Sequence, residues 1–150
     1  MRFSKTVSVI IALSLMIVSC SKDSALSGRW QYLQPPDHEG EVLDLIYNNG
    51  QWRGIMNGLE RTGDHGLFYY VVEVEGIVVK RDGSISFKVG ERRLFKKRPA
   101  LSNIGGEGDG GIIHSPMHFA GQLKDGTLML QCTDDYSCPD STLQFNRLVR

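Results

Sequence analysis

Apolar and polar side chains alternate with a period of two through most of the chain beyond residue 25. Leu43 and Leu45, for example, flank Asp44. The same parity recurs at Phe68, Tyr70, Val72 and Val74, at Ile85, Phe87 and Val89, at Leu128, Leu130 and Cys132, and at Leu143 and Phe145. This alternation is typical of antiparallel strands that bury one face and expose the other to water.

Three Asn-Gly or Asp-Gly turn signals, in residues 48–50, 81–83 and 124–126, separate alternating runs and predict hairpins. The predicted strands are 28–33, 42–47, 51–56, 67–74, 76–80, 84–89, 93–97, 117–123, 127–132 and 142–149. An antiparallel meander of about eight to ten strands must close or double over to protect its edges. We therefore expect an all-β fold, an up-and-down barrel as first choice and a β-sandwich as second.

The first residues form a different kind of segment. Arg2 and Lys5 precede a twelve-residue, mostly apolar run, 7–18. As a helix this run spans about 18 Å, short of the roughly 30 Å bilayer core, so it fits a signal peptide better than a membrane span. The run ends in Ile-Val-Ser-Cys at residues 17–20, which resembles the lipobox of bacterial lipoproteins. An ordinary secreted protein with a cysteine near its cleavage site is the alternative.

The lipobox resemblance implies cleavage before Cys20 and lipidation of that cysteine, with a diacylglycerol on sulfur and a fatty acid such as palmitate on the amine. Several acyl chains anchor a protein stably without a spanning helix. Ser21, which is not aspartate, implies the outer membrane by enterobacterial sorting rules. The expected organisation is a signal peptide at 1–19, a lipidated tether at 20–25 and one barrel domain at 26–150, held in the cell envelope and facing the periplasm.

Charge and cysteine content narrow the function classes. Lys plus Arg number 17 and Asp plus Glu also 17, so no basic excess exists for nucleic-acid binding. In the oxidising periplasm, Cys132 and Cys138 predict one structural disulfide, which is worth about 2 kcal/mol in the chain-entropy model. A redox or metal pair is the less favoured alternative, because five intervening residues make no C-x-x-C motif.

The two ends of the predicted domain carry a second resemblance. Gly28-x-Trp30 in the first strand and Phe145-x-Arg147 in the last resemble the opening and closing motifs of lipocalins and their calycin relatives. The resemblance implies a lipocalin-like barrel in which Trp30 plugs one end and Arg147 packs across its indole. We expect no counterpart of the C-terminal helix of classical lipocalins after Arg147, and Asp-Asp-Tyr at 134–136 stands outside the usual place of the family's middle motif.

Candidate catalytic and metal chemistry is sparse in the sequence. No nucleophile elbow or Cys–His pairing is recognisable, so we expect no enzyme activity and no cofactor. His114 and His118 are separated by Pro116, which argues against a helical metal site. The glycine-rich stretch within 98–116 is expected to be a mobile loop over one barrel end, because no helix follows it to build a phosphate site.

The basic run at 92–98 has two interpretations. It fits a charged strand end that blocks edge pairing, and it also fits contact with anionic lipid head groups or an acidic partner. The former is preferred because the run is short.

The leading functional hypothesis is a lipid-anchored envelope protein whose barrel binds a small apolar or amphipathic ligand. The predicted pocket is interior and lined by a subset of inward residues: Leu45, Tyr70, Val72, Phe87 and Leu130. The alternative is a protein-binding module, such as a periplasmic protease or lysozyme inhibitor that binds through loops 57–66 and 99–116, or an envelope structural protein.

Overall fold

The computed structural model describes residues 25–32, 40–62, 66–134 and 142–149. Its strands are β1 (Gly28–Gln31), β2 (Val42–Asn48), β3 (Gln51–Arg61), β4 (Leu67–Val79), β5 (Ser84–Val89), β6 (Arg92–Phe95), β7 (Gly111–Ile113), β8 (Met117–Lys124), β9 (Thr127–Cys132) and β10 (Leu143–Arg147), with a short 3-10 helix, η2 (Leu101–Asn103). Among these residues, no helix is long and apolar enough to cross a membrane.

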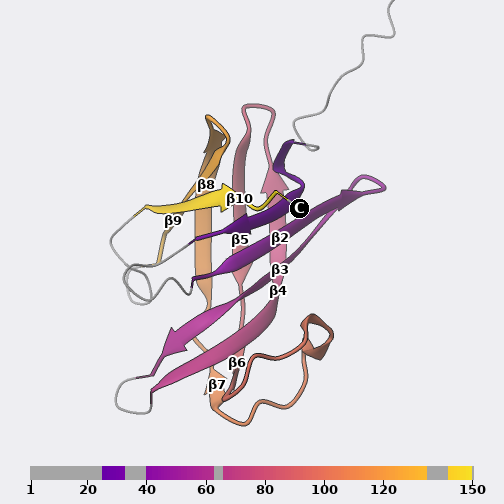
Figure 1. Cartoon of the computed structure of the whole chain (residues 1–150). Coiled ribbons are helices and arrows are strands. Elements are labelled where there is room, and N and C mark those ends of the chain that lie inside the picture. The colour runs from indigo at the N-terminus through magenta and orange to yellow at the C-terminus, as the bar shows by residue number, and fades with distance from the viewer. Residues whose placement is uncertain (1–24, 33–39, 63–65, 135–141, 150) are drawn as a thin grey trace, which may run out of the picture.

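Eight of the strands form a closed antiparallel barrel (Figure 1). Neighbours around the barrel follow the order β1, β2, β3, β4, β5, β8, β9 and β10, and β10 pairs with β1 to complete the ring. β6 and β7 extend the sheet beyond the ring, since β6 pairs with β4 and β7 with β6. The predicted all-β antiparallel barrel is thereby confirmed, and closure leaves its eight strands without a free edge.

Two of the predicted hairpin turns have the backbone that their residues favour. Asn49 and Gly50 both have positive φ, at 51° and 78°, and so do Asp125 and Gly126, at 50° and 80°. Two consecutive residues with positive φ make the type I′ turn, whose twist matches that of a β-hairpin. The β2–β3 and β8–β9 hairpins therefore follow from local sequence.

The strand prediction needs three corrections. The predicted break at residue 75 is a bulge: β4 runs unbroken from Leu67 to Val79, and its pairing with β5 shifts between Glu75 and Val78. A bulge adds a residue and bends a strand without reversing it, so the local signal mimics a turn. β3 continues to Arg61, so that much of the predicted 57–66 loop is strand. The predicted 98–116 loop contains β7, which pairs with β6.

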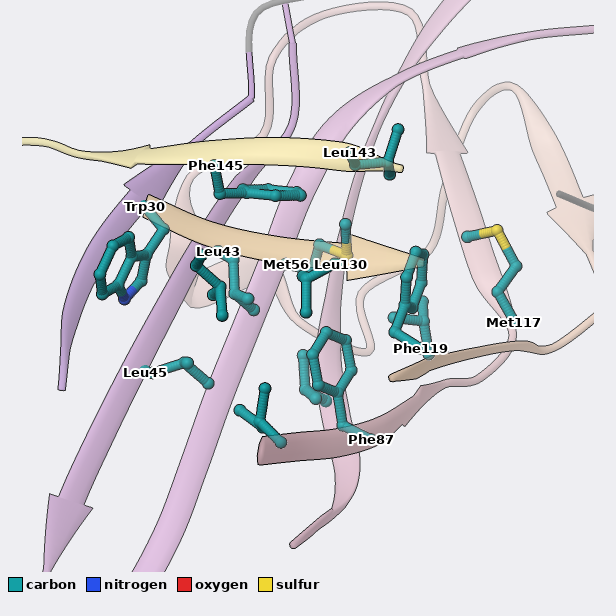
Figure 2. Packing of buried hydrophobic residues seen from close by; sticks show 14 of the residues in the cluster. Trp30, Leu43, Leu45, Met56, Phe87, Met117, Phe119, Leu130, Leu143 and Phe145 are labelled. Atoms are coloured by element: carbon teal, nitrogen blue, oxygen red, sulfur yellow. The ribbon is translucent and has the colours of Figure 1, made fainter. Parts of the chain in front are cut away.

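Inward-facing side chains from every strand of the ring pack into one hydrophobic core (Figure 2). Phe87 stacks on Phe119 with ring centroids 5.3 Å apart, and Phe145 contacts Tyr32 at 5.7 Å. Members of the predicted inward parity are fully buried, among them Leu43, Leu45, Leu128, Leu130 and Phe145. The core brings β8 and β9 so close that a Cβ added at Gly121 would lie 1.9 Å from the Met129 carbonyl oxygen.

Candidate functional site

One end of the barrel is closed by the pair that the lipocalin resemblance implied. The Arg147 guanidinium lies over the fully buried Trp30 ring, with its Cζ 4.5 Å from the ring centroid. The indole Nε1 donates to the Leu26 carbonyl at 2.9 Å, and Arg147 donates to the carbonyls of Ser27 and Ala25. A cation over an indole face is a favourable contact, and here it also covers the core.

Gly28 belongs to the same arrangement. A Cβ at this position would lie 3.2 Å from Nη1 of Arg147, so the missing side chain leaves room for the guanidinium. Trp30 and Arg147 are also direct partners in the β1–β10 register. The three residues are thus brought together although β1 and β10 lie at opposite ends of the domain sequence.

The five residues predicted to line an interior pocket are buried in the barrel. Leu45, Tyr70, Val72, Phe87 and Leu130 all belong to the hydrophobic core, and each has at most 8% of its surface exposed. Large neighbours such as Trp30, Met56 and Phe145 occupy the same interior (Figure 2). Of the five, only Tyr70 also borders the groove that the structure contains elsewhere.

That groove lies on the outer face of the barrel and has a volume of about 490 Å³. Residues of β1 to β4 with the outward parity form its floor, and the segment after β6 and the end of the chain form its sides. The lining side chains include Arg29, Gln31, Val42, Asn57, Leu59, Tyr69, Arg98, Leu101 and Leu148. The sheet separates most of the groove from the core, because inward residues alternate with these along each strand. The exceptions are Gly58 and Tyr70, which have the inward parity and still line the groove.

The groove combines apolar side chains with two arginines, of which one is paired with a carboxylate and the other lies over an aromatic ring. Arg29 is held by Asp44 in a bidentate pair, with N–O distances of 2.8 and 2.9 Å, so its charge is already matched. Arg98 lies over the Tyr69 ring, with Cζ 5.4 Å from the centroid. No carboxylate among the described residues lies within ion-pair distance of Arg98. The arrangement suits a ligand with an acidic group and an apolar body.

A partly buried polar cluster borders one part of this groove. The Tyr70 hydroxyl donates to Oε1 of Glu41 at 3.4 Å, and Arg92, only 2% exposed, donates from Nε to Oε2 of Glu60 at 3.2 Å. Arg92 also donates from Nη1 to the Ser115 carbonyl at 3.0 Å. The Tyr70–Glu41 bond joins β4 to the residue just before β2, and the Arg92–Glu60 bond joins β6 to β3.

The cluster changes the proton affinity of its members. Burial raises the pKa of Glu41 to about 7, and the Glu60 charge adds to the effect, while Tyr70 and Arg92 oppose it. Burial also raises the pKa of Tyr70 well above its ordinary value, so this hydroxyl stays neutral and can donate. Gly58 provides the space, because a Cβ there would lie 2.8 Å from Cγ of Glu41.

Sequence reasoning did not identify this cluster. Glu60 fell in a predicted loop and Arg92 in a basic run, so neither was expected to face inward. The signal available was the inward parity of Met56 on β3: continued past the predicted strand end, it reaches Gly58 and then Glu60. Arg92 has the parity of Leu94, which is buried as well.

The described histidines lie on the surface, each with its ring within hydrogen-bond distance of a different carboxylate. His114 Nδ1 is 2.8 Å from Glu91, and His118 Nδ1 is 3.0 Å from Asp134. His118 also lowers the pKa of Asp134 through hydrogen bonds from its ring and backbone. In the part of the chain that the structure describes, no three potential ligands gather into a metal site.

The basic run and the glycine-rich stretch contact each other. Arg93 donates from Nη1 to the carbonyls of Gly105 and Gly106, at 2.8 and 3.0 Å. The backbone N–H of Lys96 donates to Asp109 at 2.8 Å. Part of the run is therefore engaged in holding the glycine-rich segment against β6.

The predicted cysteine roles concern residues that the structure describes only in part. Cys132 ends β9, whereas Cys138 and Cys20 lie outside the described residues. The disulfide and the lipidation therefore stay predictions.

Comparison with known proteins adds no identity. No family model, no curated protein and no solved structure matches this chain.

Proposed function

We propose that this protein is a lipid-anchored protein of the cell envelope whose barrel binds a small amphipathic ligand with an acidic group. Its anchor would be a lipid on Cys20 in the outer membrane, with the domain facing the periplasm. Its ligand site would be the groove on the outer face of β1 to β4. The proposal keeps the ligand class expected from the sequence and moves the site from the interior to the exterior.

Arg98 is the observation that carries the ligand proposal. It places a cation on a tyrosine face at the edge of a groove whose walls include Leu59 and Leu101. A carboxylate or phosphate on the guanidinium would make charge-assisted hydrogen bonds, and an alkyl or ring body would cover the leucines. The core around Trp30, by contrast, is occupied by large side chains.

A fluorescent fatty acid is the probe that tests the groove. Micromolar affinity, about 8 kcal/mol of binding free energy, is the expected order for this probe. Arg98→Gln should weaken binding about tenfold, because a charged hydrogen bond contributes about 1.5 kcal/mol. Lys97→Gln removes the same charge from the neighbouring residue and should leave affinity unchanged. Equal losses in both variants, or no binding to the unmodified protein, would contradict the groove assignment.

The anchor is tested by Cys20→Ala. The lipid is attached to the cysteine sulfur. After detergent phase partitioning the variant should therefore be found in the aqueous phase, and its molecular mass should not include acyl groups. Native mass spectrometry of the protein purified from its own membrane would show in one experiment whether acyl groups and a bound ligand are present. Unchanged membrane retention of the variant would refute the lipoprotein assignment.

A protein-binding module is the second candidate, and the occupied interior favours it. Leu101 and Ile112, 39% and 47% exposed, lie on the segment that follows β6 and are available to a partner. A periplasmic protease or lysozyme inhibited by the purified protein, with inhibition lost in Leu101→Asp and retained in Lys97→Gln, would support this candidate over ligand carriage.

A further inference from the structure

Exposed apolar side chains gather at the end of the barrel that Trp30 and Arg147 cover, which we call the closed end. Eight large apolar residues are exposed in the described part of the chain, and five of them lie here. The five are Ile46 at 56%, Tyr47 at 38%, Val78 at 52%, Leu148 at 39% and Val149 at 90% exposure. The patch is formed by β2, β4 and the residues after β10.

The strand registers place these residues at one end. Gly28 pairs with Leu45, so β1 begins where β2 ends, and Ser84 pairs with Gln122, so β5 begins where β8 ends. Asn146 pairs with Thr127, and Arg147 pairs with Trp30, so the end of β10 joins the two halves at this level. The turns at 48–50, 80–83 and 125–126 therefore share one end of the barrel with the last residues of β10, in the upper part of Figure 1.

Aromatic and cationic side chains lie on the same hairpins as the apolar patch. Trp52 contacts Tyr47 across the β2–β3 hairpin, with ring centroids 5.1 Å apart. Arg53, Lys80 and Lys124 are exposed beside the turns. Tryptophan and tyrosine favour the boundary between headgroups and acyl chains, and cations favour an anionic lipid surface.

The chain leading to the anchor arrives at the same end. Arg147 donates to the carbonyl of Ala25, which fixes that residue beside the closed end. Cys20 is five residues earlier and can lie at most about 18 Å from Ala25. β4 runs from Leu67 to Val79, a distance of about 40 Å at strand rise. A lipid on Cys20 would hold the closed end, and not the β6–β7 end, near the bilayer.

We propose that the closed end docks on the bilayer surface, with Ile46, Tyr47, Trp52 and Val78 in the headgroup region. The contact orients the barrel so that the β6–β7 end points away from the membrane. This inference rests on the anchor proposed at Cys20, and it adds a second membrane contact that lipidation alone does not require.

The two tryptophans of the chain make the docking measurable. The lipidated full chain is reconstituted in vesicles of phosphatidylethanolamine and phosphatidylglycerol, with or without a headgroup-nitroxide lipid. Trp52 emission should be quenched by the nitroxide. The Trp52→Phe variant retains only the buried Trp30, and its emission should be quenched much less.

Matched surface variants test the orientation. Ile46→Asp combined with Val78→Asp should reduce quenching of Trp52, because buried charges disfavour the bilayer contact. Leu67→Asp combined with Ile112→Asp alters two residues of similar exposure, both 47%, at the opposite end and should leave quenching unchanged. Circular dichroism establishes that each double variant is folded. If a double variant does not fold, the comparison between the unmodified protein and Trp52→Phe still tests the docking.

The outcomes separate this inference from the anchor. An acylated, vesicle-bound protein whose Trp52 is not quenched overturns the docking surface and leaves the anchor intact. Equal effects of the two double variants also overturn it. A protein without acyl mass and without vesicle binding refutes both, whereas quenching without acylation refutes the anchor and supports the docking surface.

Discussion

Replacing Glu41 with glutamine should stabilise the barrel at neutral and higher pH. Burial raises the pKa of Glu41 from 4.5 to about 7, with Glu60 adding to the effect. At a pH below 4.5, the ordinary pKa of the carboxyl in the unfolded chain, Glu41 is protonated in both the folded and the unfolded state. As pH rises from 4.5 towards 7, the unfolded chain releases its proton while the folded protein still holds it, so the free energy of unfolding decreases. Glutamine mimics the protonated carboxyl and removes this loss.

The magnitude follows from proton linkage. Each tenfold change in proton affinity is worth about 1.4 kcal/mol, so the loss reaches about 3 kcal/mol above neutral pH. Between about pH 5 and about pH 8 it amounts to about 2.5 kcal/mol. Glu41 is partly exposed, so water screens its charge and these values are upper limits. Between about pH 5 and about pH 8, the free energy of unfolding of Glu41→Gln should therefore rise by up to about 2–3 kcal/mol relative to that of the unmodified protein.

Urea unfolding at several pH values, on the unmodified protein and on Glu41→Gln, measures the effect. Groups that the substitution does not affect cancel in the difference between the two proteins. Glu73→Gln, at an exposed position on β4, removes the same charge and is the matched control. If the gain for Glu41→Gln did not grow with pH, the carboxyl would not be held in the cluster with Glu60, Tyr70 and Arg92.

Two further predictions concern packing. Trp30→Ala should destabilise the fold by about 3–5 kcal/mol, Arg147→Ala by less, and the double variant by less than the sum, because the side chains contact each other; strict additivity in denaturant melts would refute the contact. Gly121→Ala should cost about 1–3 kcal/mol or more, because its Cβ would meet the Met129 carbonyl, whereas Gln122→Ala next to it should be nearly neutral. A thermal melt of Gly121→Ala that matches the unmodified protein would show that β8 and β9 are not this close.

Local sequence was enough to predict most strands and the faces that they bury. Leu43 and Leu45 on β2, and Leu128 and Leu130 on β9, point inward as their parity predicted. The reason is geometric: successive side chains of a strand point to opposite sides, so the alternation of apolar and polar residues shows which face is buried. Turn residues such as Asn49 and Gly50 likewise favour a two-residue hairpin turn through their own backbone preferences.

The long-range features required the tertiary structure. The bulge in β4 and the short β7 depend on which strands lie beside them, since the β4–β5 register shifts at the bulge and β7 pairs only with β6. A local pattern carries no information about those partners.

The candidate site illustrates the division most clearly. Motif spacing pointed to Trp30 and Arg147, because both resemble a family pattern that can be read along the chain. The groove near Arg98 and the cluster of Glu41, Glu60 and Arg92 have no such pattern. Their side chains come from separate strands, and their burial and proton affinity arise only when β2, β3 and β4 pair with one another and β6 pairs with β4.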